Sequence, residues 1–420
     1  MVLSNFKIGF LFLNKYKMYH IIFSADENYI KYTSVLITSI IKNTNPKNHF
    51  QNRPYSFHVL SNFVSEETRE KLECLKKELN KIYPCEISIH IMSDDRFENF
   101  PSSGAAQNSK LPYYRLKFIS LLDDNVDKCL YLDSDMLCMC DIREIFAIDL
   151  QGKIIGVVGD PGSKRSKIKF IENNTKKVLK FDENYFNSGF LLINAKEYKK
   201  ANVEKKCEEL AKKCIYIKAA DQDLLNAVIP KDKILKLSFA YNFNIITLLY
   251  VICKDEKKNR LNYTREEFTQ SAKNPKILHY GEKPWKFLKS YVDLQNRNIN
   301  DYWWDIAKEV PIFKEELLKQ KENIKDYLLY AGLGFTLYNL CKKYQLFTIK
   351  QLLQTGHDAK LIEFAKGLND DKYGLYCMLG EMVLYARKHK KGVINIILKS
   401  YKMIKMYEKY AYKSRDIKNL

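Results

Sequence analysis

Apolar runs typical of β-strands alternate with helix-like segments from Tyr19 to about Tyr280. The helix-like segments carry apolar residues three or four positions apart, whereas the strand-like runs are short and either apolar throughout or alternating. The predicted strands are Tyr19–Ser24, Tyr55–Leu60, Glu86–Met92, Lys128–Leu132, Ile154–Val158, Phe190–Ile193 and Lys276–Leu278. The predicted helices are Tyr32–Lys42, Ser65–Leu79 (with Ser65 as N-cap), Tyr113–Leu122 and Ala195–Lys213. This alternation indicates an α/β fold with a largely parallel sheet and helices on both faces.

Beyond about Asn300 the strand-like runs nearly vanish, and apolar and basic residues recur at helical spacing. One predicted face of the last helix is basic and consists of Lys399, Lys402, Lys405, Lys409 and Lys413, while another is apolar and consists of Ile397, Tyr401 and Ile404. We therefore expect three parts: an N-terminal extension (1–17) ahead of a start at Met18, a main α/β domain (18–299) and a helical, basic C-terminal region (300–420).

The 420 residues include 70 Lys and Arg against 50 Asp and Glu, a net charge of +20 at pH 7. This excess favours an anionic partner such as nucleic acid, a membrane surface or a phosphorylated substrate. No helix-turn-helix, RNA-recognition or zinc module is recognisable, so we expect no nucleic-acid partner. Cysteines stand singly in apolar runs, which favours buried thiols over disulfides. No apolar run approaches the roughly 20 residues that span a bilayer. We expect a cytoplasmic protein.

The most informative motif follows the strand Lys128–Leu132, where Asp133 and Asp135 flank Ser134. Residues two apart on an extended chain point to the same side, so both carboxylates can share one hard cation. Oxygen ligands favour Mg²⁺ or Mn²⁺, which commonly bind through one or two carboxylates and substrate phosphates. Because acidic pairs are also common on solvated loops, this motif alone leaves a solvated pair as the alternative.

A second motif closes the first predicted strand. Asp26, Asn28 and Tyr29 combine an acid, an amide and an aromatic ring that can hydrogen-bond to and stack on a nucleobase. The alternative is a capped start of the following helix.

Three further motifs place polar residues beside predicted elements. Asn187 precedes an apolar run, with a plain turn as the alternative. Asp221 and Gln222 open a helical segment, where an acid also suits the helix dipole. His279 follows a short strand and shares a loop with Lys283, which suits phosphate, although a lone His is more often structural.

Taken together and in this order, the five motifs resemble glycosyltransferase family 8, which contains bacterial lipopolysaccharide glucosyl- and galactosyltransferases and glycogenin. The resemblance covers about Tyr19 to Trp285. It implies a GT-A fold for residues 18–299, a UDP-glucose or UDP-galactose donor and Mn²⁺, with Mg²⁺ as the alternative. We therefore expect a retaining hexosyltransferase.

The resemblance also implies roles for individual residues. The metal ligands would be Asp133, Asp135 and His279. The donor-binding residues would be Ala25, Asp26, Asn28, Tyr29, Arg115, Ser134, Asp160, Asn187, Gly281 and Lys283. Among these, Tyr29 would stack on the uracil and Lys283 would contact the diphosphate. Asp221 and Gln222 would lie at the transferred sugar as the catalytic pair.

The chemistry expected from this set is departure of a nucleoside diphosphate with retention at the anomeric carbon. A divalent cation and Lys283 would neutralise the charge that develops on the leaving oxygen. Hydrolases achieve retention with a carboxylate nucleophile. Here the matching residue is Gln222, a poor nucleophile, so we favour front-face attack by the acceptor hydroxyl over a covalent glycosyl-enzyme.

The acceptor is less constrained by the sequence. We expect a glycan acceptor such as lipopolysaccharide or lipooligosaccharide core, with a protein or glycogen-like acceptor as an alternative. The basic C-terminal region fits an anionic membrane surface, on the inner face of the cytoplasmic membrane, or a solvated face of a helix that packs within the protein. A non-catalytic, basic binding protein is the alternative from another functional class.

Overall fold

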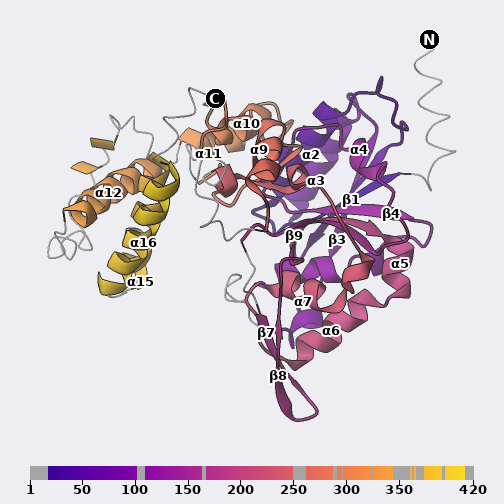
Figure 1. Ribbon diagram of the computed structural model, residues 1–420. Coiled ribbons are helices and arrows are strands. Elements are labelled where there is room, and N and C mark those ends of the chain that lie inside the picture. The colour runs from indigo at the N-terminus through magenta and orange to yellow at the C-terminus, as the bar shows by residue number, and fades with distance from the viewer. Residues whose placement is uncertain are drawn as a thin grey trace.

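The computed structural model (Figure 1) describes residues 18–101, 109–162, 167–248, 262–286, 291–295, 297–322, 325–343, 360–361, 364–365, 373–389 and 393–411. The predicted extension 1–17 lies outside these residues. In the described part of the chain, strands and helices alternate up to β13 and helices follow, as the sequence pattern predicts.

A seven-stranded sheet forms the centre of the protein, in the order β11-β6-β9-β4-β1-β2-β3. Its strands are β1 (Tyr19–Ser24), β2 (Tyr55–Ser61), β3 (Cys85–Ile91), β4 (Lys128–Leu132), β6 (Ile155–Gly159), β9 (Phe186–Asn194) and β11 (Ile234–Lys236). Neighbouring strands are parallel except that β9 runs antiparallel to both β4 and β6. The predicted mainly parallel α/β sheet is therefore confirmed.

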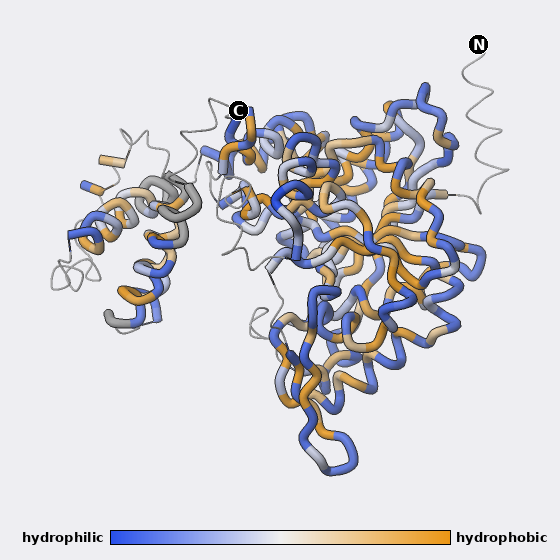
Figure 2. Tube along the Cα trace, in the orientation of Figure 1, coloured by the Kyte–Doolittle hydropathy of each residue, from blue (hydrophilic) through white to orange (hydrophobic). Residues whose placement is uncertain are grey.

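The central strands of this sheet are apolar almost throughout (Figure 2) and are buried on both faces, whereas β3 at one edge alternates buried and exposed residues. Along β1, Ile21 and Phe23 belong to one cluster of buried residues and Ile22 to another, as strand alternation requires. Figure 1 shows one set of helices above the sheet and a second set below it. The first set is α2 (Ile30–Asn43), α3 (Glu66–Leu79), α4 (Arg143–Phe146), α9 (Arg265–Lys273), α10 (Ile299–Ala307) and α11 (Lys314–Glu322), and the second is α5 (Ala195–Lys200), α6 (Val203–Lys213) and α7 (Ala220–Val228).

Two small sheets extend the central one. β5 (Met136–Cys138), β12 (Phe243–Asn244) and β13 (Ile277–His279) form the first, and β7 (Lys167–Glu172), β8 (Thr175–Lys180) and β10 (Cys214–Tyr216) form the second. The hairpin β7–β8 projects from the body (Figure 1). The first sheet matters for the site because β13 pairs antiparallel with β5, which places His279 opposite Met136.

Two predicted helices differ from the observed elements. The segment Ala195–Lys213 is divided into α5 and α6 because Asn202 adopts a left-handed backbone (φ 51°), which Asn tolerates better than most residues. The segment Tyr113–Leu122 forms two short 3₁₀ turns, Leu111–Leu116 and Ile119–Leu121, instead of an α-helix. Ser65 caps α3 as predicted, since its side chain accepts from the Thr68 N–H.

The C-terminal helices have a core of their own. The cluster that contains the sheet extends through α10 and α11 to Leu317, whereas the next cluster begins at Leu333. This second cluster joins α12 (Lys325–Lys342), α15 (Tyr373–His389) and α16 (Val393–Ala411). α12 and α15 approach so closely that a Cβ on Gly334 would overlap the Tyr376 carbonyl oxygen. The predicted domain boundary at residue 300 stays a prediction.

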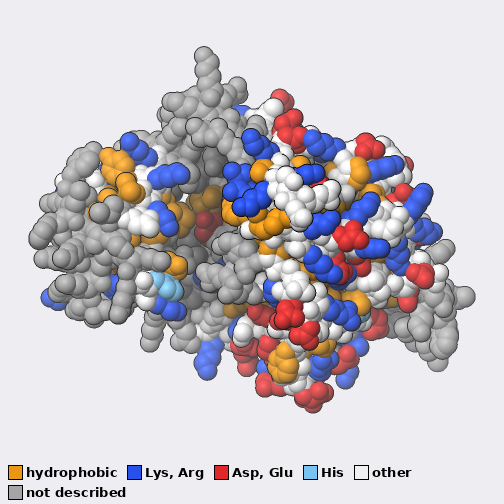
Figure 3. All heavy atoms as spheres, turned by 90° about the horizontal axis from the view of Figure 1, so that it is seen from below, with side chains coloured by type: hydrophobic (Ala, Val, Ile, Leu, Met, Phe, Trp, Pro, Cys, Tyr) orange, Lys and Arg blue, Asp and Glu red, His pale blue; other side chains and the backbone are white. Residues whose placement is uncertain are grey.

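On α16 the predicted faces are present. Lys399, Lys402 and Lys405 are exposed, while Ile404 is buried and Tyr401 packs against the same cluster. The Lys409 side chain and Lys413 lie outside the described residues. None of the described helices is both long and apolar enough to cross a membrane. On the face of the body shown in Figure 3, basic and acidic side chains are intermixed.

Candidate active site

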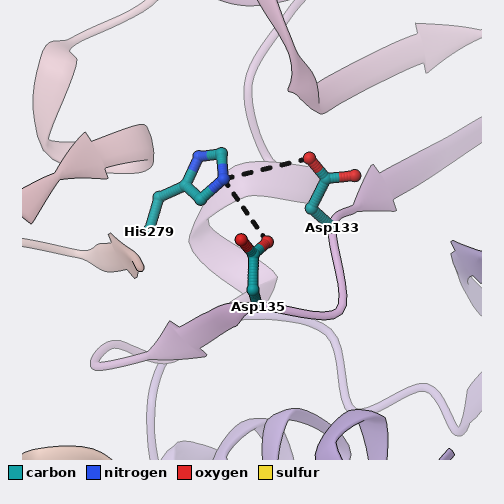
Figure 4. A group of neighbouring side chains, drawn as sticks. All are labelled: Asp133, Asp135 and His279. Carbon is teal, nitrogen blue, oxygen red and sulfur yellow. Dashed lines mark ion pairs between the residues drawn. The ribbon is translucent and has the colours of Figure 1, made fainter. Parts of the chain in front are cut away.

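The paired aspartates and a distant histidine meet at the carboxyl end of β4. Asp133 and Asp135 follow β4 directly, and His279 is the last residue of β13. His279 Nε2 lies 3.4 Å from Asp135 Oδ1 and 3.9 Å from Asp133 Oδ2 (Figure 4). One ligand atom from each of the three residues lies within 4.8 Å of the others. Two carboxylates and an imidazole at this spacing fit a divalent cation such as Mn²⁺ or Mg²⁺.

Lys283 adds a positive charge to this cluster. Its ammonium group pairs with Asp135 and donates to the Tyr280 carbonyl oxygen at 3.0 Å. Burial raises the pKa of Asp135, but the charges of Lys283 and His279 outweigh burial and hold this pKa below its usual value. Burial lowers the pKa of His279, but the Asp135 and Asp133 carboxylates together outweigh burial and raise this pKa above its ordinary value. The cluster therefore keeps Asp135 ionised.

Arg115 lies behind the cluster and joins two carboxylates. Its guanidinium is 2.7 Å from Asp133 Oδ1 and 3.1 Å from Asp221 Oδ2, and it donates to the Ser188 carbonyl oxygen at 2.8 Å. It also lies over the Tyr131 ring, 4.4 Å from the centroid. The contact with Asp221 is close but not aligned as a hydrogen bond. Arg115 is 7% exposed, so it contacts these side chains instead of solvent.

Asp221 is buried at the start of α7. Burial raises the pKa of Asp221 to about 6, against the opposing charge of Arg115, and Asp133 raises it further. Its Oδ2 atom has no hydrogen-bond partner among the described residues. A buried acid of this kind is a candidate functional group, since perturbed pKa values gather at active sites.

A chain of side-chain hydrogen bonds leads from His279 to the other end of the site. His279 Nδ1 is 2.8 Å from Asn242 Oδ1, and Asn242 Nδ2 donates to Asn187 Oδ1 at 2.8 Å. Asn187 Nδ2 donates to Gln222 Oε1 at 3.0 Å, and Gln222 Nε2 to Asp160 Oδ2 at 3.2 Å. Four of these residues are among the predicted set. Asn187 lies within β9, so the plain-turn alternative is wrong.

Sequence reasoning missed Asn242 and Gly189. Asn242 is 2% exposed and alternates with apolar residues and Asn244, a pattern that indicates a buried amide without showing its partner. A Cβ on Gly189 would lie 2.6 Å from Asp133 Oδ2 and 2.9 Å from His279 Cε1. Only a residue without a side chain leaves the cluster undisturbed.

The predicted nucleobase residues lie beside Lys283 at the end of β1. Asp26 Oδ1 accepts from the Tyr29 N–H at 2.9 Å in the turn before α2, whose N-cap residue Tyr29 makes no side-chain capping bond. The Tyr29 ring meets Trp285 edge-on at 5.8 Å. Asn28 is exposed.

The remaining predicted residues support the same edge of the sheet or lie beside it. Ser134 donates to the Ser24 carbonyl oxygen at 2.9 Å and so ties the β4 and β1 ends together. Ala25 is fully buried, and Gly281 is exposed with open space around its Cα. The surroundings of Ala25 and Gly281 do not assign a role to either residue.

Comparison with known proteins identifies the family that this chain resembles. The family described as "Glycosyl transferase family 8" matches residues 20–289. The chain is 28% identical over 336 residues to a lipopolysaccharide 1,2-glucosyltransferase of Escherichia coli, covering 76% of this chain and 88% of that protein. It is 25% identical over 236 residues to a lipopolysaccharide 1,3-galactosyltransferase of Salmonella typhimurium, covering 54% of this chain and 66% of that protein.

The fold also resembles a solved structure. The crystal structure of the galactosyltransferase LgtC in complex with donor and acceptor sugar analogues superimposes with a TM-score of 0.52 at 23% identity. The match covers 72% of this chain and 99% of that one. At this identity the likeness shows the fold.

Proposed function

We propose that this chain, which belongs to glycosyltransferase family 8, transfers glucose or galactose from a UDP-sugar to a glycan acceptor. The observation that carries the proposal is the cluster of Asp133, Asp135 and His279 with Lys283 beside it. A cation-binding site built on paired carboxylates, with the Lys283 ammonium beside it, suits a diphosphate that arrives together with a divalent ion. A purely structural ion pair would not need the third, imidazole ligand.

Mn²⁺ is the proposed ion, with Mg²⁺ as the alternative. The donor set of two carboxylates and one imidazole fits it, and the space against Gly189 admits no further side chain. Bound to the diphosphate, such an ion supplies Lewis-acid stabilisation of the leaving group. Lys283 would contribute a second positive charge to the same phosphates, since its ammonium lies at Asp135.

The transferred sugar would lie between the metal cluster and α7. Asp160, Asn187 and Gln222 present connected polar groups there, and Asp221 Oδ2, which pairs with the Arg115 charge but accepts no hydrogen bond, can accept one from a sugar hydroxyl. Asp221 would also stabilise positive charge on the anomeric carbon. Because the Gln222 amide is a poor nucleophile and is held by hydrogen bonds at both ends, we favour front-face attack by the acceptor hydroxyl.

The nucleoside would lie against the end of β1. Tyr29 would stack on the uracil, with Asp26 and Asn28 as hydrogen-bonding groups. Ala25, Ser134, Gly281 and Arg115 complete the proposed donor set, Arg115 through its hold on Asp133.

The proposed acceptor is lipopolysaccharide or lipooligosaccharide core, because relatives in E. coli and S. typhimurium carry lipopolysaccharide transferase names. A protein or glycogen-like acceptor is the alternative. An anionic membrane surface on the cytoplasmic side is the proposed partner of the exposed lysines of α16. The apolar face of α16 already packs on α12 and α15, so the contact of its lysines with a membrane would be electrostatic.

The test is a screen of UDP-sugars with Mn²⁺ that follows the release of UDP. We expect turnover with UDP-glucose or UDP-galactose and loss of turnover in Asp133→Asn and Asp135→Asn, whose carboxylates become neutral amides. Both variants should keep the wild-type circular dichroism spectrum. Equal activity of wild type and Asp135→Asn would refute the metal assignment. No turnover with any donor, together with tight Mn²⁺ and UDP binding, would indicate a non-catalytic binding protein.

A further inference from the structure

We infer that Asn242 is a positioning residue: it determines which nitrogen of His279 carries hydrogen, and it joins the cluster of Asp133, Asp135 and His279 to Gln222 and Asp160. The inference rests on the proposed function, because it concerns the metal ligand His279. It is carried by the direction of a chain of hydrogen bonds that runs from His279 through Asn242, Asn187 and Gln222 to Asp160.

The direction of this chain is set at one end by two backbone groups. The Ser188 N–H lies 3.1 Å from one terminal atom of the Gln222 amide, and the Gly189 N–H lies 3.0 Å from one terminal atom of the Asn187 amide. A backbone N–H can only donate, so both of these terminal atoms must be oxygens. The two side-chain amides therefore cannot be turned around without leaving a backbone donor unpaired.

The rest of the chain agrees with these orientations. With its oxygen at Ser188, Gln222 presents its NH₂ group to the Asp160 carboxylate, which can only accept while ionised. With its oxygen at Gly189, Asn187 presents its NH₂ group to Gln222 Oε1. Every member donates toward Asp160.

The orientation of the Asn242 amide determines the tautomer of His279. The Asn242 atom 2.8 Å from Asn187 Oδ1 must be the nitrogen, since two oxygens would repel there. The other terminal atom is then the oxygen, and it faces His279 Nδ1. An oxygen acceptor requires Nδ1 to carry hydrogen. The lone pair of a neutral ring is consequently on Nε2, the atom that lies 3.4 Å from Asp135 Oδ1.

This arrangement is what a metal-binding histidine needs. A partner on the second ring nitrogen orients the imidazole and selects its tautomer, and loss of such a partner commonly weakens metal binding about 10- to 100-fold. Asn242 is well suited to the task because it is 2% exposed and lies next to β12, which pairs with β13 beside His279. Its second function, through Asn187, is to align Gln222 with the same cluster.

Two substitutions distinguish the contact of Asn242 with His279 from its contact with Asn187. Asn242→Leu removes both contacts and should weaken Mn²⁺ binding about 10- to 100-fold. Asn242→Asp keeps an acceptor for His279 Nδ1 but cannot donate to Asn187 Oδ1. It should retain Mn²⁺ affinity within a few-fold and lower kcat at saturating Mn²⁺. Binding is measured with Mn²⁺ alone, from the electron paramagnetic resonance signal of the free ion.

Asn80→Leu is the matched control. Asn80 is also an amide bonded at both ends, to the N–H and the carbonyl oxygen of Cys85, but it joins α3 to β3 away from the site. It should lower the free energy of unfolding without changing Mn²⁺ affinity. Wild-type Mn²⁺ affinity in Asn242→Leu, or equal losses in the Leu and Asp variants of Asn242, would overturn the inference.

A spectroscopic signature is independent of turnover. In long-range ¹H–¹⁵N spectra of the Mg²⁺-saturated protein, His279 should show the hydrogen on Nδ1, and Asn242→Leu should change that pattern. Hydrogen on Nε2 in the wild type would contradict the inference. Because Mn²⁺ binding and the tautomer are measured without a sugar donor, failure of the transferase proposal would leave both readouts interpretable.

Discussion

Arg115 lies 2.7 Å from Asp133, through Nη2 and Oδ1, and this contact connects the metal cluster to the rest of the active site. The same guanidinium reaches Asp221, so one buried cation compensates two carboxylates. Because Arg115 pairs with both Asp133 and Asp221, it orients these two carboxylates.

Replacing Arg115 should therefore destabilise the protein as well as inactivate it. Arg115→Met leaves Asp133 and Asp221 without a buried cation, a change that typically costs about 3–5 kcal/mol. Arg115→Lys should cost less because it keeps the charge, but one ammonium group cannot reproduce the planar fork. Urea unfolding measures both. Exposed Arg96→Met is the control, and an equal effect at the two arginines would contradict this account.

Gly189→Ala should damage the metal cluster without unfolding the chain. The added methyl group would lie 2.6 Å from Asp133 Oδ2 and 2.9 Å from Asn187 Oδ1, so these side chains must move. We expect Mn²⁺ affinity to fall about 10- to 100-fold. Gly162→Ala is the control, since nothing lies within 4 Å of its added carbon. Unchanged Mn²⁺ affinity in Gly189→Ala would mean that the site tolerates the methyl group.

A row of histidines across β1, β2 and β3 should make the protein sensitive to acid. His58 accepts or donates at both ring nitrogens, 3.0 Å from His20 and 2.9 Å from His90. Burial lowers the pKa of His58 to about 3 and that of His20 to about 4, with Asp123 opposing the shift of His20.

The sign of the effect follows from these directions. A histidine whose folded pKa lies below its ordinary value of about 6.5 supports the fold above pH 6.5, and this support is lost as the pH falls toward the folded pKa. Between pH 6.5 and 4.5, His58→Gln should lose about 2–3 kcal/mol less stability than the wild type. Parallel stability curves from urea unfolding at each pH would contradict the assignment.

The lysines of α16 test the proposed membrane contact. Replacing Lys399, Lys402 and Lys405 by Gln should weaken binding to anionic vesicles by up to about 3 kcal/mol at low salt, at about 1 kcal/mol per basic residue. The effect should shrink at high salt because of screening. The same change at Lys205, Lys206 and Lys213, which are exposed on α6, is the matched control. Equal losses in both triple variants would assign binding to net charge alone.

The contact between His279 and Asn242 could not be predicted from the sequence. His279 could be named because its loop matched a family motif, yet no local pattern connects it to Asn242. An Asn among apolar residues indicates only that the amide needs partners when it is buried. The two residues meet because β12 and β13 pair in a sheet that also includes β5.

The sequence by itself determined the alternation of strands and helices, the family, and the acidic pair after β4, because periodicity and a D-x-D motif are properties of neighbouring residues. Only the tertiary structure decided that Arg115 stands between Asp133 and Asp221, that Gly189 must lack a side chain, and that Asn242 controls His279. Those relationships join residues from separate elements, and close packing of the folded chain alone brings their atoms together.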